Sequence, residues 1–207
     1  MHLTRLRLDP RNAQARRDLA DPYEMHRTLV RAFVEDSRHH PPRLLWRLEP
    51  GQLWTQPVVL LQSATAGDWG FLLANAGYLQ PDEDALAVKQ IDPGAMLQPG
   101  QRLRFRLAAN PTVTRGGKRL GLVGEEDQVA WLARQGERLG FALEATLVIG
   151  SDMVHARKGA MRLSLRRVLY EGVLSVRDPE AMTSALVLGI GHGKALGCGL
   201  LSLARES

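Results

Sequence analysis

The chain has 207 residues, 44% of them hydrophobic, which is enough for one large domain or two small ones. Its 27 Lys and Arg against 22 Asp and Glu give a net charge of +5, which permits a nucleic-acid or acidic-membrane partner but selects neither. The single cysteine, Cys198, excludes a disulfide framework or a cysteine zinc site within one chain, and we expect a reducing cytoplasm. We expect no signal peptide, because the first residues lack a long apolar core, and no apolar run approaches membrane-spanning length.

The first half of the chain predicts four strands and two helices. Alternation predicts a strand over residues 2–8, and a polar arm follows over 9–20. Asp21 then serves as an N-cap, Pro22 suits the first helical position, and Glu24 completes a capping box. The apolar face of this helix is formed by Met25, Leu29, Ala32 and Phe33. Beyond it we expect a pair of strands over 43–48 and 58–62, a short helix over 68–74 and a strand over 85–91.

The second half repeats this order. Proline and glycine over residues 93–100 indicate a domain boundary. Strict alternation predicts a strand over 102–107, and apolar spacing predicts an amphipathic helix over 125–139. Strands follow over 143–149 and 161–165, with a change of phase at Arg166-Arg167 that is typical of a bulge. Asp178-Pro179 opens another helix, and residues 200–204 close the chain as a strand.

Each half therefore has the order strand, helix, strand, strand, helix, strand, which is the split βαβ pattern. We predict an α+β protein of two tandem ferredoxin-like (βαββαβ) domains, spanning residues 1–92 and 100–207. The two halves share the order of their elements but no repeated sequence.

The C-terminal segment from Gly189 to Leu201 is rich in glycine around one lysine. A Walker loop would need a glycine at Leu188 and Ser or Thr at Ala195, and a dinucleotide loop would need a glycine at Lys194. Without Cβ atoms, a backbone can approach such a loop closely and its N–H groups can point outward. A flexible turn is the simplest interpretation, but the lysine favours contact with a polyanion. The candidate residues are Gly189, Gly191, His192, Gly193, Lys194, Gly197 and Gly199.

Tyr23 and His26 are neighbours on the surface of the helix that begins at Asp21, because they are three residues apart. The positive end of the helix dipole, Arg27 and Arg31 all disfavour the imidazolium form of His26, whereas a bound phosphate would favour it. His26 is thus a candidate for proton transfer near neutral pH. The alternative is an ordinary surface histidine beside a tyrosine that packs locally.

Two basic segments are candidates for RNA contact. A hairpin tip over 157–159, with the strand that follows it, carries Arg157, Lys158, Arg162 and Arg166. A mobile loop around Gly116-Gly117 carries Arg115 and Lys118. The alternative for each is a solvated charged segment. No paired carboxylates have metal-ligand spacing, so we expect no metal site and no cofactor.

Four segments together resemble one family. They are D-P-Y-E-M-H-R-T-L from Asp21, L-L-W-R-L-E-P from Leu44, R-L-R-F-R-L-A-A-N-P from Arg102 and G-I-G-H-G-K-A-L-G-C-G-L-L-S from Gly189. In this order they resemble the CasE family, the endoribonucleases that process CRISPR precursor RNA in type I-E systems. The resemblance covers nearly the full length and is weakest over residues 65–90 and 115–124.

The resemblance implies two ferredoxin-like domains and metal-independent cleavage at the 3′ side of the base of an RNA stem-loop. It also implies that the product, mature crRNA, stays bound and that the protein is a subunit of Cascade. His26 matches the family's active-site histidine, Tyr23 its tyrosine and Arg27 a nearby basic position. Arg31 stands where some relatives have lysine; arginine keeps the charge but is a poor proton donor. The rival class is a non-catalytic subunit that holds the stem of a guide RNA, and a small-molecule-binding ferredoxin-like protein is more remote.

Overall fold

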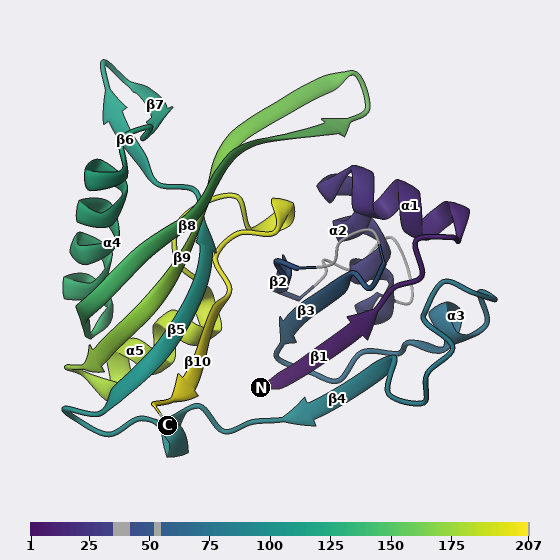
Figure 1. Cartoon of the computed structure of the whole chain (residues 1–207), viewed down its shortest axis with the longest axis horizontal. Coiled ribbons are helices and arrows are strands. Elements are labelled where there is room, and N and C mark those ends of the chain that lie inside the picture. The colour runs from purple at the N-terminus through teal and green to yellow at the C-terminus, as the bar shows by residue number, and fades with distance from the viewer. Residues whose placement is uncertain (35–41, 52–54, 207) are drawn as a thin grey trace. The chain divides into compact units, whose positions relative to one another are not determined.

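The computed structural model describes residues 1–34, 42–51 and 55–206 (Figure 1). Contacts divide the chain into two compact units. The first comprises Met1–Ile91, His155–Leu163 and Ala195–Gly197, and the second comprises Asp92–Val154, Ser164–Lys194 and Cys198–Ser207. Each unit is built around its own sheet and core.

The sheet of the first unit has four strands in the order β2-β3-β1-β4. The strands are β1 (His2–Arg7), β2 (Leu45–Leu48), β3 (Val58–Ser63) and β4 (Leu86–Gln90). All neighbours are antiparallel, and His2 lies opposite Ser63 on one side and Gln90 on the other. The helices are α1 (Ala13–Ala20), α2 (Pro22–Val30) and α3 (Gly70–Leu73), and the 3-10 turn η1 (Arg31–Phe33) follows α2 directly.

The core of the first unit joins this sheet to α2. Met25, Leu29 and Ala32 of the predicted apolar face are buried against Leu6 and Leu61 of the sheet. The strands predicted over 2–8, 43–48, 58–62 and 85–91 and the short helix over 68–74 are all confirmed. On β1, the residue that points inward beside Leu6 is Thr4, which is buried, and not the half-buried Leu3.

Two expectations for the segment before α2 were wrong. The arm over residues 9–20 contains helix α1, whose N-cap is Asn12. The side-chain oxygen of Asn12 accepts from the N–H groups of Gln14 and Ala15, so a preferred cap starts the helix. The capping box does not form, because the N–H of Asp21, which the Glu24 carboxylate would need, donates to the carbonyl of Arg17 at the end of α1.

The sheet of the second unit has four strands in the order β10-β5-β9-β8. The strands are β5 (Arg102–Ala109), β8 (Phe141–Lys158), β9 (Met161–Val176) and β10 (Leu201–Arg205). The helices are α4 (Glu125–Leu139) and α5 (Pro179–Leu188), and the 3-10 turns are η2 (Gly94–Met96) and η3 (Lys194–Leu196). A separate two-stranded sheet pairs β6 (Thr112–Arg115) with β7 (Lys118–Gly121).

The core of the second unit lies between the sheet and its two helices. Trp131 and Leu132 of α4 and Met182 of α5 are buried with Leu103 and Leu107 of β5. The predicted strand over 102–107 and both predicted helices are confirmed.

In the second unit, two strands extend well beyond the predicted ranges, and two more form where a loop was expected. The strands expected over 143–149 and 161–165 lie in the first halves of β8 and β9, which form a long two-stranded ribbon (Figure 1). The segment expected as a loop around Gly116-Gly117 is the β6–β7 hairpin, in which Arg115 lies opposite Lys118. Glycines and charged residues interrupt the alternation of apolar and polar residues in these segments. The sequence pattern therefore did not show the full length of the strands.

Each unit thus has the order βαββαβ, with its last strand beside its first, which is the ferredoxin-like arrangement. The predicted fold class is therefore confirmed. We keep the domain boundaries at residues 92 and 100 as a proposal. None of the helices in the described residues combines the length and apolar character needed to cross a membrane.

Candidate functional site

Helix α2 places the candidate catalytic residues, and Asp21 fixes its beginning. Asp21 Oδ1 accepts from the backbone N–H of Tyr23 at 2.8 Å, as an N-cap does. Its other oxygen, Oδ2, accepts from the backbone N–H of Arg157 at 3.2 Å. One carboxylate therefore joins the start of α2 to the tip of the β8–β9 ribbon, and both belong to the first unit. Two segments singled out separately in the sequence meet here.

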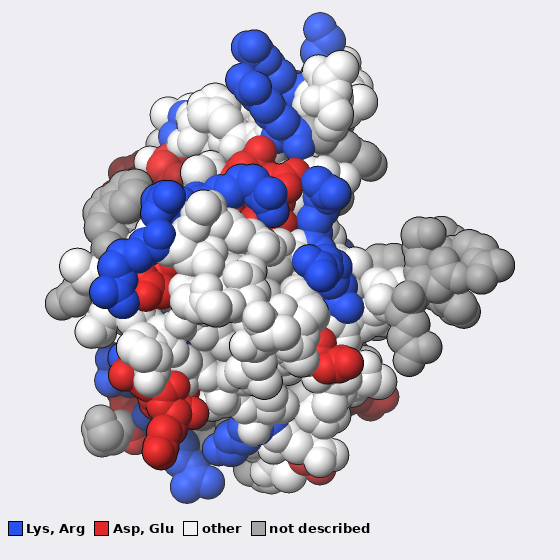
Figure 2. Space-filling model, turned by 90° about the vertical axis from the view of Figure 1, so that its right-hand side faces the viewer, with Lys and Arg blue, Asp and Glu red and all other residues white. Residues whose placement is uncertain are grey.

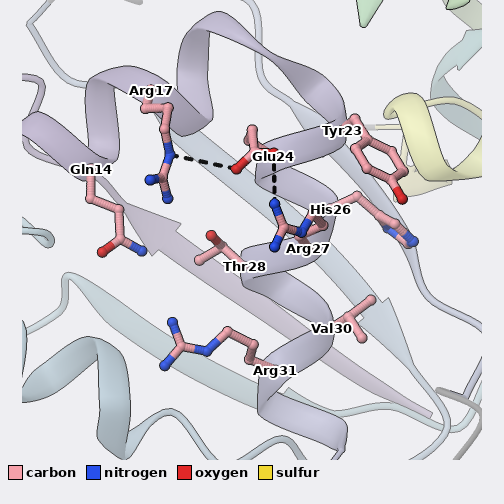
Figure 3. Close-up of a pocket in the computed structure, with 9 residues that line it drawn as sticks. All are labelled: Gln14, Arg17, Tyr23, Glu24, His26, Arg27, Thr28, Val30 and Arg31. Atoms are coloured by element: carbon pink, nitrogen blue, oxygen red, sulfur yellow. Dashed lines mark hydrogen bonds and ion pairs between the residues drawn. The ribbon is translucent and has the colours of Figure 1, made fainter. Parts of the chain in front are cut away.

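Tyr23 and His26 project from the same side of α2 (Figure 3). His26 is half-buried, and its Nδ1 atom is shielded from solvent without a hydrogen-bond partner among the described residues. Burial lowers the pKa of His26 below its ordinary value of about 6.5. The neutral imidazole is therefore the form present at neutral pH, and it is the form that can accept a proton.

The two candidate arginines lie elsewhere on the helix. Arg27 donates to Glu24 Oε1 at 2.9 Å, and Glu24 also pairs with Arg17 of α1 at 3.6 Å. Arg31 lies on the side of α2 away from His26, with its guanidinium 4.3 Å from the centre of the Phe71 ring (Figure 3). The expectation that these arginines depress the pKa of His26 was wrong, because burial is the cause of the shift.

A shallow cavity of about 460 Å³ lies along α2. Tyr23, His26, Arg27 and Arg31 all line it, together with Arg17 of α1. The lining therefore includes a neutral imidazole on one side of α2, and guanidinium groups, those of Arg17 and Arg31, on the other. Such a combination can accept a proton and stabilise developing negative charge on a phosphate.

The glycine segment is folded and has little exposed backbone. Gly189, Gly191, Gly193, Gly197 and Gly199 all have positive φ, between 75° and 95°. The amides of Gly189, Ile190, Cys198 and Gly199 donate to carbonyls of the protein, so they do not point outward as expected. Lys194 Nζ donates to the carbonyl of Gly191 at 2.6 Å.

His192 is the exposed residue of this segment and forms an isolated bridge with Asn110. Its pKa is lowered by burial first and then by the positive charges of Arg119 and Lys194. The potential around His192 is therefore positive, as a site for a polyanion requires. Arg119, on β7, was not among the candidates from the sequence.

At Gly197 an aromatic ring lies close to the position that a side chain would occupy. A Cβ there would lie 3.2 Å from the ring of Trp46, which is buried on β2. Gly159, at the tip of the ribbon, also has positive φ, but a Cβ there would meet no heavy atom within 4 Å. The two glycines thus share a positive φ, but only at Gly197 would a Cβ meet neighbouring atoms.

Replacing Gly197 with alanine should lower the free energy of unfolding by about 2 kcal/mol, from left-handed strain and from displacing Trp46. Replacing Gly159 with alanine should cost about 1 kcal/mol, since only the backbone strain applies. Urea denaturation of both variants measures the difference. Equal losses would show that Trp46 does not hold this segment.

Apart from Lys158, the basic candidates are exposed or half-buried. Arg115 and Lys118 face solvent on the β6–β7 hairpin, and Arg162 does so on β9. Arg166 donates to the Ser151 hydroxyl across the ribbon at 3.3 Å. Lys158 ends β8, and its side chain lies outside the described part.

Positive charge is not continuous on the face drawn in Figure 2. Blue Lys and Arg side chains gather in its upper part, with acidic side chains between them and an uncharged area below. Several arginines are paired, including Arg7 with Asp84 at 2.7 Å and Arg167 with Asp152 at 2.9 Å. Within the residues that the structure describes, no three His, Cys, Asp or Glu side chains cluster as metal ligands would.

Comparison with known proteins places these features in a family. The family model described as "CRISPR associated protein" matches residues 1–205. The CRISPR-associated endoribonuclease Cse3 of Thermus thermophilus is 43% identical over 218 residues, covering 99% of this chain and 100% of that protein. The chain belongs to the CasE/Cse3 family. The resemblance found in the sequence is therefore confirmed.

A second relative and a solved structure are also similar to the chain. The CRISPR system Cascade subunit CasE of Escherichia coli strain K12 is 35% identical over 134 residues, covering 58% of this chain and 65% of that protein. A structure of Thermus thermophilus Cse3 bound to an RNA representing a pre-cleavage complex has a TM-score of 0.87 and 43% identity. That match covers 99% of this chain and 98% of the other.

Sequence reasoning missed the residues that support α2 from α1. Asp18 is buried, and its Oδ2 accepts from the Thr28 hydroxyl at 2.7 Å and from the Tyr78 hydroxyl at 2.9 Å. Thr28 belongs to α2, so this carboxylate anchors the helix that carries the candidate residues Tyr23 and His26. The available signal was Asn12 followed by Ala15 and Leu19, which is a cap and an apolar stripe.

Proposed function

We propose that this CasE/Cse3 chain is a metal-independent endoribonuclease acting on the stem-loop of CRISPR repeat RNA. It cuts precursor crRNA at the 3′ base of the stem and keeps mature crRNA as a subunit of Cascade. The observation that carries the proposal is the placement of Tyr23 and His26 beside the ribbon tip at Arg157, through Asp21. The names of the relatives, an endoribonuclease and a Cascade subunit, support the same function.

The proposed reaction is attack of a ribose 2′-hydroxyl on the adjacent phosphate. Neutral His26 accepts the proton of the 2′-hydroxyl, the O2′–P bond forms and the P–O5′ bond breaks. The leaving 5′-oxygen takes up a proton from solvent water, which gives a 5′-hydroxyl and a 2′,3′-cyclic phosphate, and the His26 imidazolium returns its proton to solvent. Tyr23 positions the ribose or phosphate from the same side of α2.

Charge on the phosphorane is stabilised by cations of the cavity. Arg27 is the candidate nearest to His26 in sequence, and it must leave Glu24 to bind the phosphate. This exchange costs little, because the Arg27–Glu24 ion pair at 2.9 Å is exposed and weak. Arg31 can swing from the Phe71 ring in the same way. Lys194, the glycine segment and the basic residues Arg115, Lys118, Arg157, Lys158, Arg162 and Arg166 are proposed contacts to the RNA backbone.

Chelation tests the metal-independent part of this proposal. Cleavage of a repeat stem-loop RNA by the purified chain should proceed at the same rate with and without EDTA, because His26 and the arginines supply the proton transfer and the charge. Gel analysis of end-labelled RNA measures both rates. Loss of cleavage in EDTA that added Mg²⁺ restores would reject metal independence, and binding without cleavage in either buffer would favour the non-catalytic subunit.

A further inference from the structure

Every polar group of Asp21 takes part in a hydrogen bond, so this residue joins α1, α2 and the tip of the ribbon. Its backbone N–H donates to the carbonyl of Arg17 at 3.1 Å, and its carbonyl accepts from the N–H of Met25 at 3.0 Å. Its two carboxylate oxygens accept from the backbone N–H groups of Tyr23 at 2.8 Å and of Arg157 at 3.2 Å. A residue held at each of these points keeps one geometry, as the support of a functional site requires.

The bond from Asp21 to Arg157 is not needed to cap α2. Asp178 begins α5 with the same Asp-Pro pair, and its Oδ1 alone accepts from the N–H groups of Glu180 and Ala181, each at 3.0 Å. One side-chain oxygen is therefore enough for an N-cap, and Asn and Ser are as suitable as Asp at this position. The second oxygen of Asp21 thus has a separate role, which can be removed without removing the cap.

The tip of the β8–β9 ribbon has few other supports. Strand β5 pairs with β9 only over residues 168–175, so the part of β9 nearest the tip pairs with β8 alone. A two-stranded hairpin is marginally stable by itself. Residues 155–163 belong to the first unit, and among the described residues the bond from Arg157 to Asp21 is the hydrogen bond that joins them to the rest of it. Ala156, with a single methyl group, is buried there. The bond is therefore suited to fix where the tip lies beside α2.

The two sides of this bond carry complementary chemistry. Arg157 is exposed and uses its backbone N–H for Asp21, and its guanidinium has no partner among the described residues. A free guanidinium can bind a phosphate through two parallel hydrogen bonds. On the other side, Asp21 caps the helix that carries Tyr23 and His26. Asp21 therefore lies between a group that can hold RNA and the groups proposed to cut it.

We propose that Asp21 is a positioning residue for RNA cleavage, and this inference rests on the proposed function. Its carboxylate fixes the ribbon tip against the start of α2, so an RNA backbone held by the tip presents the scissile phosphate to Tyr23 and His26. Asp21 itself does not touch the reacting atoms and moves no proton. Cleavage rates fall steeply when reacting groups are misplaced by about 1 Å, so loss of this bond should slow cleavage more than it weakens binding.

Asp21→Asn and Asp21→Ser test the inference, because each keeps one oxygen for the cap and loses the acceptor for Arg157. Single-turnover cleavage of the repeat stem-loop RNA should be about tenfold slower in both variants, the effect of one lost hydrogen bond to a charged group. The Kd of the uncut RNA, from fluorescence anisotropy, and the Tm should be nearly unchanged. Losing a negative charge favours RNA binding, so weaker electrostatic attraction cannot explain slower cleavage.

The matched control is Asp178→Asn, which makes the same change of charge at the cap of α5 and should leave cleavage unchanged. Slower cleavage in this control as well would show that the effect comes from charge or from capping. Unchanged cleavage in both Asp21 variants, or equal losses of binding and cleavage, would overturn the inference.

A backbone variant tests the other end of the bond. Arg157→Pro removes the N–H donor, whereas Arg157→Ala keeps it, and both lack the guanidinium. Adding Asp21→Asn should slow cleavage about tenfold in the Arg157→Ala background. It should change little in the Arg157→Pro background, where the bond is already absent. Equal effects in the two backgrounds would contradict a role through this bond. If Arg157→Pro fails to fold by circular dichroism, the two Asp21 variants and the Asp178 control decide.

A measurement without cleavage separates this inference from the proposed function. NMR follows the His26 ring while repeat RNA with a 2′-deoxyribose at the scissile position is added. The RNA should shift the His26 signals of the unaltered chain, and Asp21→Asn should bind it with a much smaller shift. Cleavage of unmodified RNA without this difference rejects the positioning role alone, and the difference without cleavage rejects the nuclease alone.

Discussion

Replacing His26 with alanine is expected to lower the rate of RNA cleavage by a factor of about 10² to 10⁴, the usual contribution of a proton-transfer group. Binding of the uncut stem-loop should be nearly unchanged, because the variant keeps the arginines of the cavity and the basic ribbon. Single-turnover cleavage and fluorescence anisotropy measure the two quantities. The matched control is His2→Ala. His2 is the first residue of β1, and its Nδ1 lies 3.3 Å from the Ala64 carbonyl oxygen.

The pH dependence of cleavage tests the same role of His26 in proton transfer. Burial lowers the pKa of His26, so the imidazole is neutral above that value and charged below it. If His26 accepts the proton, the rate should fall only as the pH drops below about 6.5, the ordinary value for histidine. The His26→Ala variant should lack this decline. A fully active His26→Ala variant would remove His26 from the mechanism.

Replacing Asp18 with alanine is expected to lower the free energy of unfolding by about 3 kcal/mol, because two buried hydroxyls lose their acceptor. Thr28 and Tyr78 both donate to this carboxylate, and the partners come from α2 and from the segment after α3. For a chain of this size the loss corresponds to a fall of roughly 10 °C in Tm. Urea and thermal denaturation measure it.

A triple variant tests whether the loss of stability comes from the two hydrogen bonds to Asp18. When Thr28→Val and Tyr78→Phe accompany Asp18→Ala, no hydroxyl remains unpaired, and much of the lost stability should return. Glu83→Ala, an exposed acid, should change stability by less than about 0.5 kcal/mol. A single Asp18→Ala variant as stable as the unaltered chain would show that the network contributes nothing.

The elements that follow from local sequence were predictable, and α2 shows why. Asp21, Pro22 and an apolar stripe lie within a few residues of one another, so cap, start and buried face can all be read together. Strict alternation over residues 102–107 defined β5 in the same way. The order of such elements was sufficient to predict both ferredoxin-like units.

The features that were missed are of two kinds, a short helix with little local pattern and contacts between residues distant in the sequence. The N–H of Asp21 is taken by Arg17 only because α1 ends there, and the apolar stripe of α1 is too short to stand out. Tyr78 and Asp18 are 60 residues apart, and Phe71 is brought to Arg31 by the fold of the first unit.

The candidate site was predicted in part. Tyr23 and His26 were singled out from their spacing, and the structure places both on one side of α2. The link from Asp21 to Arg157 spans 136 residues and could not be seen in the sequence. The proposed RNA cleavage depends on the start of α2, the tip of the ribbon and a bound RNA together. It could therefore be predicted from the sequence only through the family resemblance.

The measurement that tests the central claim most directly is cleavage of two RNAs that differ in one atom. The chain is incubated with the repeat RNA of its own CRISPR array and with the same RNA carrying a 2′-deoxyribose at the scissile position. The unmodified RNA should be cut to a 2′,3′-cyclic phosphate and a 5′-hydroxyl, and the deoxy RNA should bind but stay intact. Cleavage of the deoxy RNA at the same rate would contradict attack by the 2′-hydroxyl and the role assigned to His26.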